Sequence, residues 1–258
     1  MSKQALAFEN VSFSYEPQQK QTSSLVLDSL ALSVNEGEFI SLLGPSGSGK
    51  STIFRLITGL EQPTAGTISL HNEVSSNRLG KVGYMPQQDL LLEWRTILEN
   101  ATLPLELKGT NKKEAKQLAK QHLQDFGLNG YENHYPQALS GGMRQRVSFL
   151  RAMLSGSNIL LLDEPFSALD AMTRLTMQEW LLEQWEKTKK TIIFITHDVD
   201  EALLLSDRIF LFSARPISSY EEIHVPLKRP RTIEKMSEPT MVELKRELLQ
   251  QLRKQVKL

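Results

Sequence analysis

Cysteine is missing from all 258 residues, so the chain can form neither a disulfide bond nor a thiolate site. Neither charge is in excess, because 30 Lys and Arg residues balance 30 Asp and Glu residues. No overall field therefore draws the chain to nucleic acid or to anionic lipid. Apolar runs such as Ile159–Leu162 are too short to cross a bilayer, and Met1–Leu6 lacks the apolar core of a signal peptide. We expect a membrane role only through a partner, and the lack of cysteine fits a reducing cytoplasm.

A glycine-rich stretch lies between an apolar run, Phe39–Leu43, and the helical pattern Ile53–Ile57. Strand, loop and helix in that order are the context in which G-x-x-x-x-G-K-[ST] predicts a phosphate-binding P-loop rather than an incidental turn. Lys50 would reach the outer phosphates, and the Ser51 hydroxyl would bind Mg²⁺. The chain is therefore predicted to bind a nucleoside triphosphate. The residues of the loop are Gly44, Pro45, Ser46, Gly47, Ser48, Gly49, Lys50, Ser51 and Thr52.

A second helix start, Ser140-Gly141-Gly142, precedes a helix that we expect to begin near Met143. Ser140 is a good N-cap, and the two glycines would let backbone amides face outward, as at an anion site. The stretch lacks the Lys-Ser pair of a P-loop. Taken alone, such a start is ordinary capping more often than ligand binding.

Polar residues follow two apolar runs that are typical of strands buried on both faces of a parallel sheet. Asp163 and Glu164 end the first run, and His197 follows the second, Thr191–Ile195. Ligands collect at the carboxyl ends of such strands. Asp163 is placed to hold Mg²⁺, and Glu164 to act as general base on water, although helix capping is an alternative for one of them. His197 would hydrogen-bond a γ-phosphate or the water, whereas a lone histidine after a strand is usually incidental.

The remaining patterns predict α/β organisation. Residues 5–15 nearly alternate apolar and polar and predict a half-buried strand with a bulge near Glu9-Asn10, followed by an exposed connection over 17–24 and a second strand over 25–34. Residues 88–157 read as an inserted, mostly helical subdomain. The cluster Leu90–Trp94 would be either core or an exposed contact patch. Residues 213–231 are expected to be extended. The tail, 232–258, contains a helix over 240–258 whose apolar face would pack on its own domain, a second copy or a partner.

The combination resembles the nucleotide-binding subunits of ABC transporters. The resemblance covers the chain from Leu6 to about Arg231, and Leu139–Met143 looks like the ABC signature motif, with methionine where glutamine is common. It implies a P-loop NTPase (RecA-like) core with an antiparallel β subdomain and an inserted helical subdomain, so that 1–231 form one cassette. It also implies the cofactors ATP and Mg²⁺.

The resemblance also assigns residue roles. Tyr15 looks like the aromatic residue that stacks on adenine, and Gln87 like the glutamine that contacts Mg²⁺ and the permease. A head-to-tail dimer of two copies is implied, in which each ATP lies on the P-loop of one copy and under Ser140-Gly141-Gly142 of the other. Asp170 would help to couple the two ATP sites.

Within the family, Leu91–Thr96 and Ser213–Pro216 look like the importer branch for nitrate, sulfonates, taurine and thiamine precursors, which commonly has proline where Glu93 stands. The resemblance thus implies an ATPase held at the cytoplasmic face of the membrane by a permease and served indirectly by a solute-binding protein. One alternative is a soluble ABC ATPase acting on nucleic acid or ribosomes, which usually has coiled-coil inserts or two fused cassettes. Another is a small-molecule P-loop kinase, which would not use the signature motif or His197.

Overall fold

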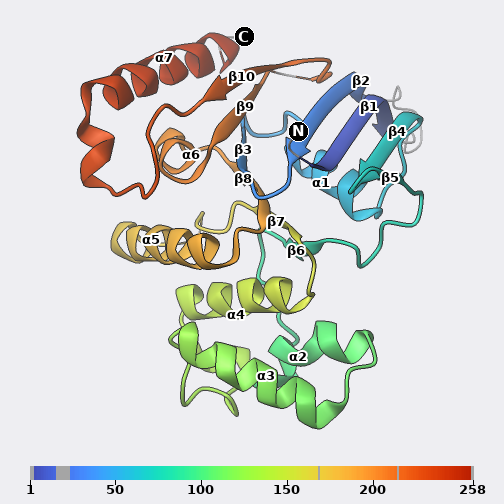
Figure 1. Ribbon diagram of the computed structural model, residues 1–258, viewed down its shortest axis with the longest axis vertical. Coiled ribbons are helices and arrows are strands. Elements are labelled where there is room, and N and C mark those ends of the chain that lie inside the picture. The colour runs from blue at the N-terminus through green and yellow to red at the C-terminus, as the bar shows by residue number, and fades with distance from the viewer. Residues whose placement is uncertain (1–2, 16–23, 168, 214, 257–258) are drawn as a thin grey trace. The chain divides into compact units, whose positions relative to one another are not determined.

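The computed structural model describes residues 3–15, 24–167, 169–213 and 215–256. The chain divides into two compact units, each drawn in Figure 1. Unit 1 comprises Met1–Leu79 and Gln178–Leu258, and unit 2 comprises Gly80–Met177. The helical block predicted over 88–157 lies within unit 2. Among the described residues, no helix is both long enough and apolar enough to span a membrane.

Unit 1 contains a four-stranded antiparallel sheet in the order β2-β1-β4-β5. The register of β1 shifts between Phe8 and Val11, and Asn10 takes a positive φ of 51°, which confirms the predicted bulge. Most of the predicted connection over 17–24 lies outside the described residues. The strands are β1 (Gln4–Tyr15), β2 (Ser24–Asn35), β4 (Ala65–Leu70) and β5 (Glu73–Val74).

A second group of strands in unit 1 has the order β10-β9-β3-β8. Strands β3, β8 and β9 are parallel to one another and entirely buried, as their continuous apolar sequences predict. Strand β10 pairs antiparallel with β9 and was not predicted, because its sequence alternates weakly and lies within the stretch expected to be extended. The strands are β3 (Phe39–Leu43), β8 (Thr191–Thr196), β9 (Arg208–Phe212) and β10 (Tyr220–His224).

Helix α7 (Pro239–Val256) confirms the predicted tail helix and resolves how it packs. Met241 and Leu248 are buried in a cluster with residues of α6, so the tail packs on its own unit. Lys245 forms an ion pair with Asp200 of α6 at 2.7 Å. The buried face is narrower than predicted, because Val242 and Leu249 of the predicted apolar face are 53% and 37% exposed. The helical elements of unit 1 are α1 (Lys50–Thr58), α6 (Val199–Leu205), α7, the 3-10 turn η2 (Glu234–Ser237), and residues 178–188 of α5 (Ala171–Thr188).

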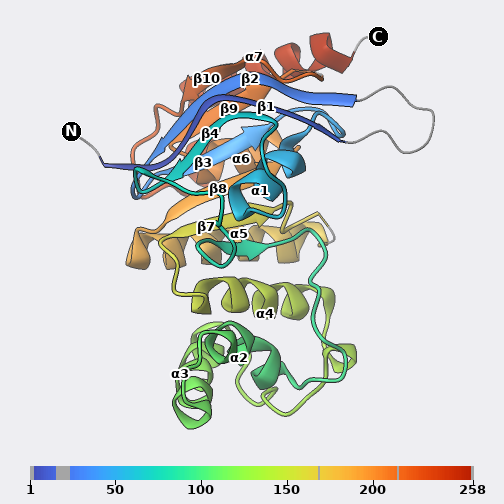
Figure 2. The ribbon, with the colours of Figure 1, turned by 90° about the vertical axis from the view of Figure 1, so that its right-hand side faces the viewer.

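Unit 2 consists of two short parallel strands and a group of helices, α2, α3 and α4, which contact one another (Figure 2). A capping box formed by Thr96 and Glu99 begins α2. Phe126 stacks on Phe149 of α4, with ring centroids 5.9 Å apart. The elements are β6 (Gly83–Met85), α2 (Ile97–Leu107), α3 (Lys112–Asp125), η1 (Pro136–Ala138), α4 (Gly141–Leu154) and β7 (Ile159–Asp163).

Candidate functional site

The loop between β3 and α1 depends on glycine at two positions. A Cβ atom at Gly44 would lie 2.7 Å from the carbonyl oxygen of Phe212, and one at Gly49 would lie 2.7 Å from Cγ1 of Val26. Gly49 also has a φ of +116°, which residues with side chains rarely adopt. Backbone therefore approaches its neighbours here more closely than any other residue would allow.

Lys50 is the first residue of α1, and its side chain folds back over the loop. Its ammonium donates hydrogen bonds to the carbonyl oxygens of Gly44 (2.9 Å) and Pro45 (2.8 Å) and to Oγ of Ser48 (3.4 Å). The residue is only 5% exposed. A lysine ammonium held over the loop at the start of a helix is placed to contact an anion such as phosphate.

The rim of the loop faces solvent at Ser46, Gly47 and Ser51. No side chain caps α1, because its N-cap residue is Gly49. The first turn of a helix directs N–H groups outward and carries the positive end of the helix dipole. The start of α1 is therefore suited to binding an anion such as phosphate.

Tyr15 lies next to this loop, although 36 residues separate it from Thr52. Its hydroxyl is 3.2 Å from Oγ1 of Thr52, and its ring meets Phe13 edge to face at 4.8 Å. Over a third of the residue is exposed. One edge of the ring is thus held while an aromatic surface beside the loop stays accessible.

His197 lies at the same edge of the parallel strands as the P-loop. Leu43 of β3 pairs in register with Thr196 of β8, so Gly44 and His197 each follow directly on paired residues. The turn that contains His197 is held by hydrogen bonds of its two neighbours, Thr196 and Asp198. The Thr196 hydroxyl donates to Glu201 and accepts from the Asp198 amide, and Asp198 caps α6. The histidine is exposed, as a group that meets a ligand needs to be.

Two of the predicted groups of unit 2, Gln87 and Glu164, are in direct contact. Nε2 of Gln87 donates a hydrogen bond to Oε2 of Glu164 at 3.1 Å. The pairing of Met85 with Leu162 explains this meeting, since both residues lie near the carboxyl ends of parallel strands. Glu164 has a positive φ of 44°, which is unusual for a residue with a side chain and recurs at functional sites. Asp163 is 6% exposed.

The predicted magnesium ligands have the chemistry that this ion prefers. Ser51, Asp163 and Gln87 offer a hydroxyl, a carboxylate and an amide oxygen, which are the hard oxygen ligands that Mg²⁺ takes. Because Gln87 donates through its amide nitrogen, its carbonyl oxygen remains for a cation. No group of three or more His, Cys, Asp or Glu residues that would hold a metal ion occurs within the described ranges.

The second helix start is built differently from the first. Ser140 caps α4, its Oγ accepting from the amide of Met143 at 3.3 Å, so the N-cap prediction is confirmed. The helix begins at Gly141, two residues earlier than expected. A Cβ at Gly141 would meet nothing within 4 Å, whereas one at Gly142 would lie 3.0 Å from Cγ2 of Thr173. Gly142 thus packs closely against Thr173, while Gly141 is open on its outer side.

Asp170 stands at the start of α5 and accepts a hydrogen bond from the amide of Thr173 at 3.0 Å. Hydrogen bonds from Thr173 hold the pKa of its carboxyl below the usual value, so the group stays ionised at neutral pH. The structure thus shows that Asp170 caps a helix within unit 2. The predicted role in coupling the two ATP sites would be a second role of the same residue.

The backbone of the segment 89–96 is held by hydrogen bonds from residues that the sequence analysis did not predict to be important. Asn100 is fully buried and donates to the carbonyl oxygens of Leu92, Arg95 and Thr96. On α4, Arg144 pairs with Asp89 at 2.9 Å, and Arg151 donates to the carbonyl oxygens of Asp89 and Leu90. Basic residues on a helix usually face solvent, so spacing alone did not reveal these contacts.

This pinned segment carries both buried and exposed apolar residues. Leu91 is 8% exposed, while Leu90 and Trp94 are 58% and 75% exposed. The two interpretations left open by the sequence each hold for part of the cluster. An exposed indole on an ordered backbone is typical of a contact surface.

Comparison with known proteins places these features in one family. The sequence model described as "ABC transporter" matches residues 27–167. The formylaminopyrimidine import ATP-binding protein ThiZ of Halalkalibacterium halodurans is 52% identical over 241 residues, covering 92% of each chain. The aliphatic sulfonates import ATP-binding protein SsuB of Bacillus cereus is 42% identical over 233 residues, covering 90% of each chain.

A solved structure of an ATP-binding cassette is also similar to this chain. The ATP-binding cassette MJ0796, determined as a dimer in a post-hydrolysis state with ADP and Pi, superposes with a TM-score of 0.76 at 31% identity. The match covers 86% of this chain and 100% of that chain.

Proposed function

This chain belongs to the ABC transporter family, and on that premise we propose that it is the ATP-binding and ATP-hydrolysing subunit of an importer. The observation that carries the proposal is the start of α1, where glycine-dependent backbone, an uncapped helix and the buried ammonium of Lys50 occur together. Each of these supports binding of a phosphate. His197, at the same strand edge, would donate a hydrogen bond to the outer phosphate.

The residues of unit 2 would supply the hydrolytic step. The Glu164 carboxylate orients a water molecule and accepts its proton, while the Gln87 amide fixes the direction in which that carboxylate points. Lys50 stabilises charge that develops on the transferring phosphoryl group. Tyr15 would stack its exposed ring on the adenine.

Ser51, Asp163 and Gln87 would hold Mg²⁺, whose charge would offset that of the phosphate oxygens. The residues themselves keep their oxygens in position: Asp163 ends a buried strand, and Gln87 is tied to Glu164.

Two copies would share each nucleotide. The Ser140-Gly141-Gly142 start of one copy would cover the ATP that lies on the P-loop of the other, in a head-to-tail dimer. The open outer side of Gly141 supports this role, because a phosphate would approach the backbone there without obstruction. Asp170 would couple the two sites, and hydrolysis would release the dimer.

A membrane permease would dock on the surface formed by Leu90 and Trp94. Asn100, Arg144 and Arg151 hold the backbone of this surface in place through hydrogen bonds. A displacement of Gln87 would therefore be transmitted to the surface, whereas a flexible loop would absorb it. The chain would then act at the cytoplasmic face of the membrane, with a solute-binding protein delivering the solute to the permease. The relatives' names favour an aliphatic sulfonate or a formylaminopyrimidine as that solute.

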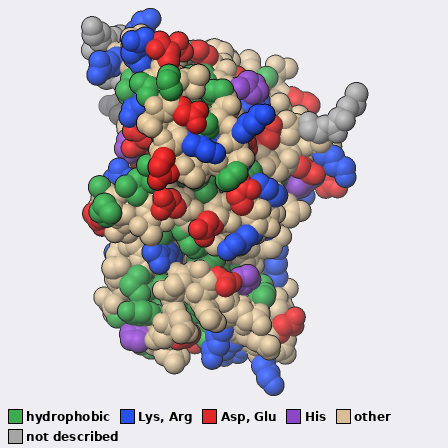
Figure 3. Space-filling model, turned by 60° about the vertical axis from the view of Figure 1, so that its left-hand side comes forward, with side chains coloured by type: hydrophobic (Ala, Val, Ile, Leu, Met, Phe, Trp, Pro, Cys, Tyr) green, Lys and Arg blue, Asp and Glu red, His purple; other side chains and the backbone are tan. Residues whose placement is uncertain are grey.

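An ABC ATPase that acts on nucleic acid is disfavoured. Both relatives described above are importer subunits. The face drawn in Figure 3 intersperses acidic with basic side chains, whereas nucleic-acid binding needs a concentrated basic surface.

The variant Glu164→Gln tests the proposed base. It should lower ATP turnover by about 100-fold while ATP still binds, because a neutral amide cannot accept the proton. Steady-state hydrolysis and nucleotide titration measure the two effects, with Glu73→Gln, an exposed substitution on β5, as control. Normal turnover by Glu164→Gln would show that another group is the base.

The same variant tests the shared site and the permease. With ATP, Glu164→Gln should elute as a dimer; a strict monomer would count against two copies sharing a nucleotide. Co-expression with candidate permeases should then reveal which binding-protein ligand stimulates hydrolysis by the native chain. Substituting Trp94→Ala should abolish that stimulation and leave basal hydrolysis intact.

A further inference from the structure

Glu201 is a buried acidic residue that the proposed mechanism does not use. It lies in the first turn of α6, shortly after His197, and is only 6% exposed. The other buried residues of this short helix, Val199 and 202–205, are apolar. Burial of a carboxyl group costs free energy unless its oxygens are hydrogen-bonded, so the partners of Glu201 indicate what it does there.

Both oxygens of the Glu201 carboxyl group accept hydrogen bonds from buried neighbours. The Thr196 hydroxyl donates to Oε2 at 2.6 Å, and Nε2 of Gln178 on α5 donates to Oε1 at 3.2 Å. Thr196 and Gln178 are 2% and 4% exposed. The carboxyl group therefore joins the end of β8 to α5 and α6 within the interior of unit 1.

The Thr196 hydroxyl connects this carboxyl group to the turn that contains His197. A hydroxyl has one proton, and because Thr196 donates it to Glu201, the lone pairs remain for the Asp198 amide, which donates to them at 3.0 Å. Thr196 directly precedes His197, and Asp198 directly follows it. The backbone on both sides of the histidine is thus tied to one buried carboxyl group.

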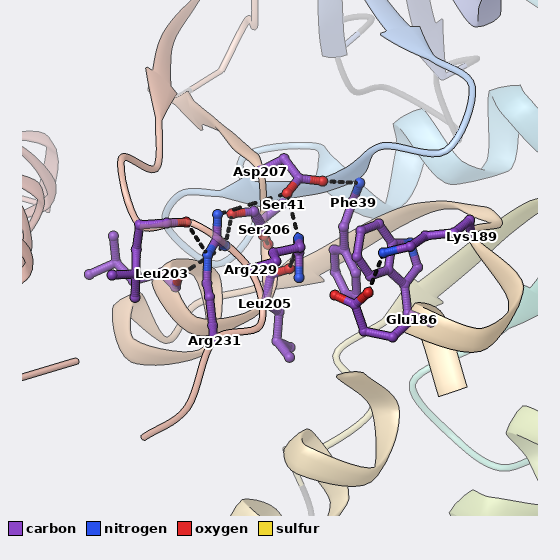
Figure 4. A network of polar contacts seen from close by, with 12 residues as sticks. Phe39, Ser41, Glu186, Lys189, Leu203, Leu205, Ser206, Asp207, Arg229 and Arg231 are labelled. Atoms are coloured by element: carbon purple, nitrogen blue, oxygen red, sulfur yellow. Dashed lines mark hydrogen bonds and ion pairs between the residues drawn. The ribbon is translucent and has the colours of Figure 1, made fainter. Parts of the chain in front are cut away.

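Helix α6, which carries Glu201, is anchored at its carboxyl end (Figure 4). The guanidinium groups of Arg229 and Arg231 donate hydrogen bonds to carbonyl oxygens there. The acceptors are Leu203, Leu205 and Ser206. Asp207 follows the helix and accepts from the amide of Phe39 at 3.0 Å, which ties this end to the start of β3. Glu201 therefore stands on a held helix, from which it can restrain the turn at the other end.

We propose that Glu201 is a positioning residue for His197. Through the Thr196 hydroxyl it fixes the backbone of the turn, and with it the direction in which the imidazole meets the outer phosphate, because a side chain's direction follows from its backbone. Glu201 is buried and acts only through this turn. The inference rests on the proposed function, in which His197 donates a hydrogen bond to that phosphate.

Two variants of Thr196 test the link. Thr196→Val keeps nearly the same shape and removes the hydroxyl, so it should lower kcat for ATP about tenfold, while KM changes by at most about twofold because the P-loop still binds ATP. Thr196→Ser keeps the hydroxyl and should have a kcat within about twofold of the native value. Steady-state hydrolysis measures both constants. A native kcat in Thr196→Val would overturn the proposal.

A second variant removes the carboxyl group itself. Glu201→Leu/Gln178→Leu replaces both partners with apolar side chains, which leaves no buried amide without its acceptor, and it should also lower kcat about tenfold. The matched control is Glu38→Gln, which changes a part-buried carboxylate that pairs with Arg208 at 2.8 Å, before the start of β3. The control should keep the native kcat. Equal losses in the two variants would attribute the effect to stability and overturn the proposal.

The decisive measurement repeats Thr196→Val in a chain that already carries His197→Ala. His197→Ala alone should lower kcat about 100-fold. Since the link acts through the imidazole, Thr196→Val should then lower kcat no further, whereas a general structural effect would add its own tenfold loss. Additive losses would overturn the proposal and leave the ATPase function intact. If the native chain hydrolyses no ATP, the proposed function fails, and this inference fails with it.

Discussion

The two glycine-containing helix starts of this chain, at α1 and at α4, differ in how the first turn of the helix is capped. Helix α1 follows Gly49, has no side-chain cap and lies under a folded-back Lys50. Helix α4 follows Ser140, whose hydroxyl already accepts from a first-turn amide. No side chain caps the first turn of α1, and a lysine ammonium lies beside it. In α4 the Ser140 hydroxyl already accepts one of the first-turn amides.

This difference separates two tasks. A helix start without a side-chain cap, next to a lysine ammonium, is suited to holding a polyphosphate firmly. A capped start is stable without a ligand and offers only its outer face, at Gly141, for a contact that forms and breaks. The proposed cycle needs one binding site that holds each ATP throughout and a second contact with it that forms and breaks.

The largest effect is expected at the first helix start. Lys50→Met should weaken ATP binding and lower turnover by about 100-fold, because the ammonium is the only side-chain charge predicted to contact the outer phosphates. Nucleotide titration and steady-state hydrolysis measure the change. The exposed substitution Lys113→Met serves as control. Tight ATP binding by Lys50→Met would remove the distinction drawn between the two starts.

Gly49→Ala should destabilise the chain by about 2 kcal/mol, because it places a Cβ 2.7 Å from Val26 at a φ of +116°. Chemical denaturation measures the free energy of unfolding. Gly109→Ala is the matched control: its φ is +77°, but its Cβ would meet nothing within 4 Å, so it should cost about 1 kcal/mol. Equal losses would show that the close approach to Val26 contributes little.

Gly141→Ala should behave in the opposite way at the second start. Its Cβ has open space, so the free energy of unfolding should stay within about 0.5 kcal/mol of the native value. Turnover should nevertheless fall about tenfold, because the methyl group would obstruct a phosphate held by the other copy. ATP affinity of the separate copy should not change. Full turnover would indicate that Ser140-Gly141-Gly142 only begins a helix.

The smallest effect is expected at Tyr15. Tyr15→Leu should weaken ATP about threefold through the lost stacking, with no effect on tripolyphosphate, which has no base. Tyr15→Phe keeps the ring and loses only the hydroxyl contact with Thr52, so its ATP affinity should match that of the native chain. A parallel loss for ATP and tripolyphosphate would mean that Tyr15 supports the loop instead of binding the base.

Much of the fold could be predicted from local patterns. The strands at 39–43, 159–163 and 208–212 were recognisable because strands buried on both faces are continuously apolar. The short helix α6 was missed because seven residues show too little periodicity, and β10 was missed because it lies at a sheet edge with a half-exposed pattern. The burial of Asn100 and the pairing of Arg144 with Asp89 had no local signal.

The linear order of residues is enough to establish the P-loop, the signature stretch and the acids that end a buried strand, because each consists of neighbours along the backbone. Packing alone establishes that Tyr15 meets Thr52, that Gln87 meets Glu164 across 77 positions, and that Trp94 is exposed. The physical reason is that covalent spacing defines a loop or a cap, whereas distant side chains meet according to strand register and the shape of the core, to which the whole chain contributes.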